Sequence, residues 1–417
     1  MQGSGIVVVL LIFLTITWSI DYYLYQGVLT AIKDWEKQIG AQLVKWGFWI
    51  LSIGLPLTTL IGFVVLREPP KASSFSGILV NLSITFMVTK LVFLLFILGE
   101  DIYRLFYWVY DKVTSSGDVA MPSRRKFVSQ VGILTAAVPF TAFIYGITKG
   151  RYRYTVRKKT LYFSDLPEAF DGFTITQISD VHSGSFDDKQ AVQRGIDLIN
   201  EQKSDLFVFT GDLVNSSADE FDDYRDLFAQ VRAPYGQYSI LGNHDYADYG
   251  SLPTEEAKEA DRAKLRQHHK DIGYKLLRDE NVRIEKDGSH ISLLGVENWG
   301  KGFGERGDLE KALLGVDTDS FKVLLSHDPT HFEEQVKKHP KQIHLTLSGH
   351  THGMQMGVEF GNFKWSPVKF RYPHWADLKE ENGRKLYVNR GFGFIGFTGR
   401  VGIWPEITVL ELKRGEA

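Results

Sequence analysis

Four long apolar segments near the start of the chain constrain its fold more than any other feature. They are residues 5–25, 46–66, 78–98 and 127–148. Asp21 and Lys90 are the only charged residues inside them. Each segment is close to the ~20 residues that a helix needs to cross the hydrocarbon core of a bilayer. We therefore expect four transmembrane helices within residues 1–150 and a separate domain over residues 151–417.

Lys90 stands in the middle of the third apolar segment. Placing a charged side chain at that depth of a bilayer costs roughly several kcal/mol of free energy, unless the charge reaches the interface or faces protein. Two interpretations are open: a polar contact inside the helix bundle, or a lysine that the membrane tolerates.

Basic residues in the loops bear on the topology. The loop MPSRRKFVSQ (121–130) resembles a twin-arginine export signal at residues 123–127, and it equally fits an ordinary basic cytoplasmic flank. Both interpretations place this loop in the cytoplasm, so the last helix would run outward. A second basic cluster, RYRYTVRKK (151–159), would invert the whole topology if it were cytoplasmic. The arginine pair favours an extracytoplasmic domain carried by a multi-pass protein of a bacterial inner or cell membrane.

Composition excludes several classes of chemistry. The chain has 417 residues, which exceeds the usual size of one domain and favours two units. It contains no cysteine, so disulfides, thiolate metal sites and a cysteine nucleophile are excluded. Its formal net charge of −2 gives no overall basic surface, and we expect no nucleic-acid partner.

From about residue 160, apolar runs alternate with polar helical stretches. Continuous apolar strands are typical of sheets that are covered on both faces, and the helical stretches can supply that cover. The sequence therefore predicts a layered α/β fold. One stretch, residues 254–271, reads as a charged, solvated helix, and we interpret its His268 and His269 as surface residues.

Five predicted strands end in residue types that bind metals. These residues are Asp180 and His182, Asp212, Asn243 and His244, His327, and His350 and His352. Carboxylates, imidazoles and an amide oxygen without sulfur suit Mn, Fe, Zn or Co. Two ions ~3.5–4 Å apart need one bridging carboxylate among their ligands. The pattern predicts a dinuclear metal site at the ends of the strands.

The order of these motifs resembles that of the calcineurin-like metallophosphoesterase superfamily. The motifs stand here as SDVH, TGDLV, GNHD, SHDP and GHTH, and the resemblance covers roughly residues 160–417. The membrane-anchored bacterial branch and the animal transmembrane metallophosphoesterases look most similar. The resemblance implies a layered αββα sandwich after the four-helix region. That branch tends to have Gly-His-Thr-His-Gly-Gly-Gln, and here Met354 replaces the second of the paired glycines.

The resemblance also implies roles for the residues. The implied ligands form two sets: Asp180, His182 and His352 for one ion, and Asn243, His327 and His350 for the other. Asp212 would bridge the ions, of which Mn is favoured, and a metal-activated hydroxide would attack phosphorus. His244 would protonate or stabilise the leaving oxygen. Asp245 would either orient His244 or have a structural role.

Two further stretches keep alternative interpretations. The basic and aromatic segment FKWSPVKFRYPHWADL (363–378) follows the GHTH turn. It fits a lip that lies against anionic lipid headgroups, and equally a packed cap of core aromatics. Asn389 and Arg390 end a predicted strand, where they would contact a phosphate or lie in a solvated loop.

The sequence as a whole predicts a membrane-anchored, metal-dependent phosphodiesterase. Its expected partners are the lipid bilayer and a phosphodiester that is lipid-linked or associated with the cell envelope. One alternative is a cytoplasmic-side UDP-diacylglucosamine pyrophosphatase of lipid A synthesis, which an inverted topology would favour. The other is a non-catalytic membrane scaffold that keeps the fold, and the complete set of ligands argues against it.

Overall fold

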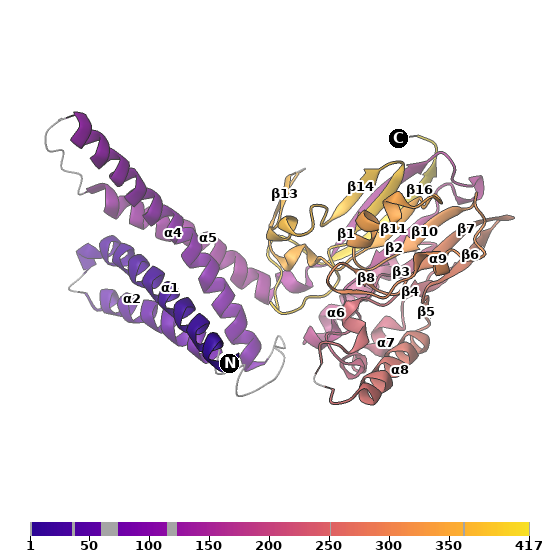
Figure 1. Cartoon of the computed structure of the whole chain (residues 1–417), viewed down its shortest axis with the longest axis horizontal. Helices are drawn as coiled ribbons and strands as arrows, with labels where there is room; N and C mark the ends of the chain where they lie inside the picture. Colours follow the sequence, from indigo (N-terminus) through magenta and orange to yellow (C-terminus); the bar gives the residue numbers. More distant parts are fainter. Residues whose placement is uncertain are drawn as a thin grey trace. The chain divides into compact units, whose positions relative to one another are not determined.

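The computed structural model describes residues 2–35, 38–59, 74–114, 123–250, 252–361 and 363–416. The chain divides into two compact units, residues 1–145 and residues 146–417. The first consists of helices and the second is built on β-sheets (Figure 1). A helical N-terminal region and a sheet-based α/β domain are thereby confirmed, whereas the count of four membrane helices and the αββα order of layers stay predictions.

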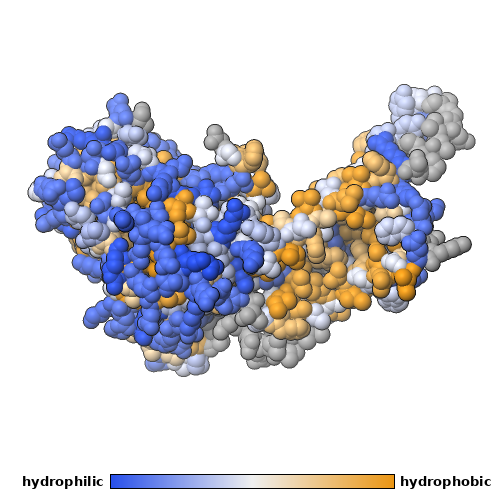
Figure 2. Space-filling view, turned by 180° about the vertical axis from the view of Figure 1, so that it is seen from behind, coloured by the Kyte–Doolittle hydropathy of each residue, from blue (hydrophilic) through white to orange (hydrophobic). Residues whose placement is uncertain are grey.

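The described α-helices of the first region are apolar, and all except α2 are long. They are α1 (Gln2–Ala31), α2 (Ile39–Trp49) with a π-helical turn (Ile50–Gly54), α4 (Phe75–Thr114) and α5 (Ser123–Thr148). Within the described ranges, α4 and the stretch Arg124–Thr148 of α5 are long and apolar enough to cross a membrane. Figure 2 shows an apolar surface over this unit and a mostly hydrophilic surface over the other. Part of the second predicted segment, residues 60–66, lies outside the described residues.

A buried ion pair joins α1 to α4. Lys90 Nζ lies 2.7 Å from Asp21 Oδ1, and the Asp21 side chain is almost fully buried. Of the two interpretations of Lys90, the structure supports a polar contact inside the helix bundle. Each charge compensates the other where neither has enough water to solvate it.

Removing one partner of this pair should destabilise the helical unit. We expect Lys90→Met to cost about 3–5 kcal/mol, because it leaves the Asp21 carboxylate buried without a counter-charge. The thermal midpoint of the detergent-purified protein would fall, and a double Lys90→Met, Asp21→Asn variant would recover most of the loss. Lys112→Met, an exposed lysine on the same helix, is the matched control. A midpoint equal to that of the control would contradict a stabilising pair.

The second unit contains two six-stranded sheets. In the first, the strands lie in the order β1 (Thr155–Phe163), β16 (Glu406–Arg414), β2 (Thr174–Ile178), β3 (Leu206–Phe209), β4 (Gln237–Ser239) and β5 (Lys275–Leu276). In the second, the order is β14 (Asp377–Glu381), β15 (Arg384–Val388), β11 (Leu345–Ser348), β10 (Phe321–Leu325), β7 (Ser289–Gly295) and β6 (Glu280–Lys286). Strands β2, β3 and β4 run parallel, as do β7, β10, β11 and β15.

The two sheets share one hydrophobic core. Ile175 and Val208 of the first sheet belong to the same buried cluster as Leu293 and Val323 of the second. The neighbouring Leu324 of β10 lies in another cluster, with α9 (Leu309–Ala312) and α10 (Thr330–Glu334). Successive residues of a strand point to opposite faces, so β10 is buried on both of them. Its continuous apolar run reflects this double cover.

The remaining helices of this unit are α6 (Lys189–Glu201), α7 (Arg225–Phe228) and α8 (Glu255–Asp271). Asp188 caps α6 by accepting a hydrogen bond from the Ala191 amide, which satisfies one free donor of the first turn. The α6 residues Val192, Ile196 and Ile199 are buried at the spacing of one helix face.

The interpretation of two histidines on α8 as surface residues is wrong. His268 and His269 are both buried. They follow Leu265 by three and four residues, which places all three on the buried face of the helix. His269 Nδ1 lies 2.9 Å from Ser239 Oγ at the end of β4, and burial lowers the pKa of His269 to about 3. The histidine is therefore a neutral core residue.

Candidate metal centre

The predicted ligand residues come directly after the parallel strands of both sheets. Asp180 and His182 follow β2, Asp212 follows β3, Asn243 and His244 follow β4, His327 follows β10, and His350 and His352 follow β11. The carboxyl ends of parallel strands meet at one edge of a sheet, where their loops converge. The structure brings the ligand residues together at this edge.

The backbone at these positions is unusual. The φ angles are 54° at Asp180, 47° at His182, 61° at Asp212, 69° at His350 and 50° at His352. Residues other than glycine adopt positive φ rarely, and such residues cluster where a function holds the side chain in place. The left-handed turns direct successive side chains back toward the ends of the strands.

Two glycines allow the loops to approach one another. A Cβ atom added to Gly349 would lie 1.9 Å from Ser179 Oγ, and one added to Gly242 would lie 2.2 Å from Asp212 Oδ1. Neither position has room for a side chain. This explains why glycine precedes the ligands in the GHTH and GNHD motifs.

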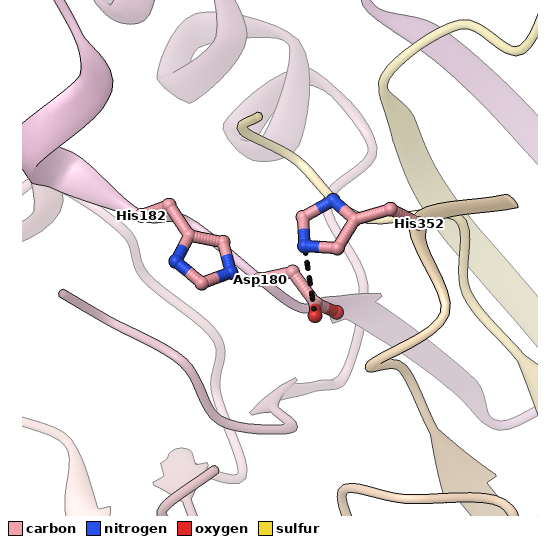
Figure 3. Close-up of side chains that lie close together, drawn as sticks. All are labelled: Asp180, His182 and His352. Carbon is pink, nitrogen blue, oxygen red and sulfur yellow. Dashed lines mark ion pairs between the residues drawn. The ribbon is translucent and has the colours of Figure 1, made fainter. Parts of the chain in front are cut away.

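Asp180, His182 and His352 form the first group of potential ligands. Their ligand atoms lie within 4.8 Å of one another, and all three residues are buried. The close-up shows the two imidazoles next to each other with the carboxylate beside them, and His352 Nε2 is 3.3 Å from Asp180 Oδ1 (Figure 3). Both nitrogens of His182 and Nε2 of His352 make no hydrogen bond to the described residues. Buried polar atoms normally have partners, so these nitrogens fit a bound cation.

Asp212, His327 and His350 form the second group, with Asn243 beside them. His327 Nε2 is 3.2 Å from Asp212 Oδ2, and His350 Nδ1 is 2.8 Å from Asn243 Oδ1. Asp212 Oδ2 is also 3.5 Å from His182 Nε2 in the first group. This carboxylate lies between the two groups, in the position that a bridging ligand requires.

Burial sets the protonation of most of these side chains. It lowers the pKa of His182 to about 3 and that of His350 to about 4, so both imidazoles are neutral, as metal ligands must be. Burial also raises the pKa of Asp180 to about 6. At Asp212 burial opposes ionisation, but the facing histidines, His327 first, hold the pKa well below its usual value.

His327 differs from the other histidines. Burial alone would lower its pKa, but the charge and hydrogen bond of Asp212 outweigh burial and raise the pKa to about 10. Without a metal, His327 and Asp212 therefore form an ion pair. The Nδ1 atom of His327 lies 2.7 Å from the carbonyl oxygen of Thr210, so the Nε2 atom of His327 faces the site.

The contacts of Asp245 support the structural role that the sequence left open. Its carboxylate accepts hydrogen bonds from the backbone amides of Gly242, Asp212 and Leu213, at 2.9, 2.8 and 2.8 Å. This carboxylate ties the loop after β3 to the loop after β4. The His244 ring is held elsewhere, since its Nδ1 lies 2.7 Å from the carbonyl oxygen of Asn215.

Sequence reasoning missed two tyrosines beside the ligands. The Tyr372 hydroxyl lies 2.8 Å from His350 Nε2 and 3.3 Å from Asp328 Oδ2. Tyr249 stacks on His244 with ring centres 4.3 Å apart, and its hydroxyl accepts a hydrogen bond from Asn243 Nδ2 at 3.1 Å. Partners of this kind fix the orientation of metal ligands. Asp328 stands inside the SHDP motif and Tyr372 inside the aromatic segment 363–378, which was not linked to the ligands, whereas Tyr249 offered no signal.

Both interpretations of Arg390 are wrong. Its guanidinium is fully buried and forms ion pairs with Glu359, Asp377 and Glu406, so it is neither solvated nor free for a phosphate. Three carboxylates around one guanidinium hold the pKa of Arg390 far above its usual value despite burial. Asn389 is buried as well and donates to Thr408 Oγ1.

Metal binding should release protons. In metal-free protein near pH 7.5, which lies below the His327 pKa of about 10, His327 is protonated. Binding requires its neutral form, so we expect release of about one proton per chain from this residue. The measurement is calorimetric titration with Mn²⁺ in two buffers that differ in heat of ionisation. His327→Gln should release less, and His339→Ala, which changes a histidine outside the two ligand groups, should match wild type. A binding heat independent of buffer would contradict His327 as a ligand.

Comparisons with known protein families agree with the two units. A family model described as calcineurin-like phosphoesterase matches residues 173–354. A second model, described as the transmembrane domain of a probable calcineurin-like phosphoesterase, matches residues 6–151. Together with the two apolar helices, the second match indicates a membrane protein.

Similar proteins occur in bacteria and vertebrates. An uncharacterized metallophosphoesterase of Bacillus subtilis, YkuE, is 30% identical over 70% of this chain and 98% of its own length. A transmembrane protein with metallophosphoesterase domain from Danio rerio is 27% identical over 78% of this chain and 71% of its own. An uncharacterized metallophosphoesterase of Helicobacter pylori is 24% identical over 90% of this chain and 91% of its own.

Proposed function

Because the chain belongs to the calcineurin-like metallophosphoesterase family, we propose that it is a membrane-anchored phosphodiesterase that uses two divalent metal ions. The observation that carries the proposal is the pair of ligand groups on either side of Asp212. Hydrolysis of a phosphodiester requires stabilisation of negative charge on both the attacking and the leaving oxygen. Two adjacent cation sites meet that requirement.

The residues present fit two ions of the Mn, Fe, Zn or Co class, with Mn favoured. Asp180, His182 and His352 would hold one, His327, His350 and Asn243 the other, and Asp212 both. When bound, the ions would acidify water and neutralise charge on the phosphoryl group. The orphaned nitrogens of His182 and His352 and the sulfur-free ligand set support this assignment.

His244 is the residue that we assign to proton transfer. Its amide donates to Asp212 Oδ1 at 2.8 Å, which places it directly beside the shared carboxylate. Its Nδ1–H donates to the carbonyl oxygen of Asn215, so the second proton of the imidazolium form is on Nε2, and this is the proton that we assign to the leaving oxygen. The stacked ring of Tyr249 holds the imidazole plane in place for that transfer.

The substrate that we propose is a lipid or envelope-associated phosphodiester, and the site lies on the extracytoplasmic face of a bacterial membrane. The match to a transmembrane domain supports a membrane-associated substrate, and the bacterial relatives support a bacterial membrane. The paired Arg124 and Arg125 before the last helix support the outward orientation. The cytoplasmic pyrophosphatase alternative requires the opposite orientation.

Hydrolysis of bis-p-nitrophenyl phosphate with Mn²⁺ tests the reaction. We expect turnover by the detergent-purified protein, its loss with a chelator, and a decrease of about 10²–10⁴-fold in His244→Ala because proton transfer is removed. Asp212→Asn should abolish turnover, since an amide is a poor bridging ligand. His339→Ala, which changes a mostly buried histidine that pairs with Glu310 and is not among the ligand residues, is the matched control. Near-normal activity of Asp212→Asn would refute the dinuclear mechanism.

The topology can be tested with one introduced thiol, because the chain has no cysteine. Leu314 is 71% exposed in the second unit. In intact cells a membrane-impermeant maleimide should label Leu314→Cys without prior lysis. Labelling only after lysis would place the site in the cytoplasm and favour the pyrophosphatase alternative.

A further inference from the structure

A short two-stranded ribbon belongs to neither large sheet. Its strands are β12 (Val358–Phe360) and β13 (Phe363–Trp365), and it follows the turn that carries His352 (Figure 1). The other two-stranded piece, β8 (Trp299–Gly300) with β9 (Gly304–Glu305), is separate from it.

The register of the ribbon sorts its residues onto two faces. Val358 pairs with Trp365 and Phe360 with Phe363, while Glu359 pairs with Lys364. Directly paired residues of an antiparallel ribbon lie on the same face, and alternate residues lie on opposite faces. One face is therefore apolar and aromatic, and the other is charged.

The charged face is turned toward the protein. Glu359 forms ion pairs with the buried Arg390 and with Arg157 of β1. Lys364 lies 3.0 Å from Asp377 Oδ2 of β14 and also donates to the carbonyl of Ala376. These contacts anchor the ribbon through its polar residues.

The apolar face is turned outward. Phe360 is 84% exposed, Phe363 60% and Val358 53%, and Phe370 close by in the chain is 81% exposed. Six of the nine exposed large hydrophobic residues described in residues 146–416 fall within residues 354–370. A ribbon in water has the reverse arrangement, with apolar residues inward and charges outward. Such a concentrated patch indicates an apolar partner.

The chemistry of the patch fits the interfacial region of a bilayer. Phenylalanine and tryptophan beside Lys369 and Arg371 are the residue types of interfacial anchors, where rings enter the headgroup boundary and cations meet anionic lipids. The β-unit is also tethered closely to the predicted membrane helix α5. Only residues 149–154 separate α5 from β1, and that stretch spans at most ~20 Å when fully extended.

We propose that Met354, Val358, Phe360, Phe363, Trp365 and Phe370 form a docking face that enters the surface of an anionic bilayer. The docking face is close in sequence to residues of the metal centre. Phe370 precedes Tyr372, whose hydroxyl contacts the ligand His350, and Met354 follows the ligand His352 by two residues. Docking of this face deepens the proposed function. Its consequence for catalysis rests on that function: a phosphodiester at the bilayer surface would reach the metals past this face.

A fluorophore on a single introduced thiol tests the docking directly. The full-length Phe360→Cys protein, labelled with an environment-sensitive nitrobenzoxadiazole group, is placed in nanodiscs of phosphatidylcholine with phosphatidylglycerol. We expect blue-shifted emission and quenching by lipids that carry a bromine or nitroxide in the acyl chain. The same label at the exposed Leu314→Cys position should show neither. Equal spectra at the two positions would overturn the proposal. Shielding seen only with two copies per disc would also overturn it, in favour of self-association.

Activity provides an independent readout. A Phe360→Ser, Phe363→Ser, Phe370→Ser variant in phosphatidylglycerol vesicles should hydrolyse hexadecyl p-nitrophenyl phosphate at least roughly tenfold more slowly than wild type, because three aromatic side chains no longer partition into the bilayer. Its hydrolysis of soluble bis-p-nitrophenyl phosphate should be unchanged. Equal losses on both esters would overturn delivery from the bilayer. If wild type hydrolyses neither ester, the proposed function fails, while the fluorophore result still decides the docking.

Discussion

The buried carboxylate of Asp212 is the constraint on which the β-unit depends. It lies within 3.5 Å of His182 and 3.2 Å of His327, at the meeting point of loops from both sheets. Burying this charge without compensation would be prohibitive, so the surrounding residues must compensate it. Asp180 adds a second acidic group. The site combines two carboxylates with imidazoles that burial keeps mostly neutral, an arrangement that divalent cations balance. The left-handed loops, the close glycines and the amides gathered by Asp245 all serve to hold this concentration of ligands.

The ligand residues could be predicted from sequence because each stands at the end of an apolar run, and strand ends are local features. The tyrosines beside them could not. Tyr372 is 22 residues from its partner His350 and separated from it by the ribbon, and no local pattern announces that contact. The predictions for Arg390 were wrong for the same reason, since its carboxylate partners come from three different parts of the chain. The prediction that His268 lies on the surface was wrong for another reason. Most residues of α8 are charged, and the apolar residues of its narrow buried face are too few to stand out in the sequence.

The two units compensate their buried charges in different ways. In the helical unit the buried carboxylates that the structure describes are paired one to one, Asp21 with Lys90 between α1 and α4 and Glu100 with Arg104 within α4. In the β-unit, buried charges occur in larger groups, of which Arg390 with its three carboxylates is one. That group links β14, β16 and the ribbon of β12 and β13. The same guanidinium therefore supports both the sheet edge near the metal centre and the ribbon that carries the docking face.

Met354, a residue of the docking face, combines a strained backbone with an exposed side chain. Its φ angle is 53°, a conformation that glycine adopts without strain and that costs other residues roughly 1–2 kcal/mol. Its side chain is nevertheless 49% exposed, so burial in the core does not repay the strain. In water, a side chain that is half exposed gains little apolar burial to offset that strain. If the docking face enters a bilayer, this side chain gains apolar contacts there that offset the strain, and variation at position 354 among related chains should then follow the lipid that each one meets.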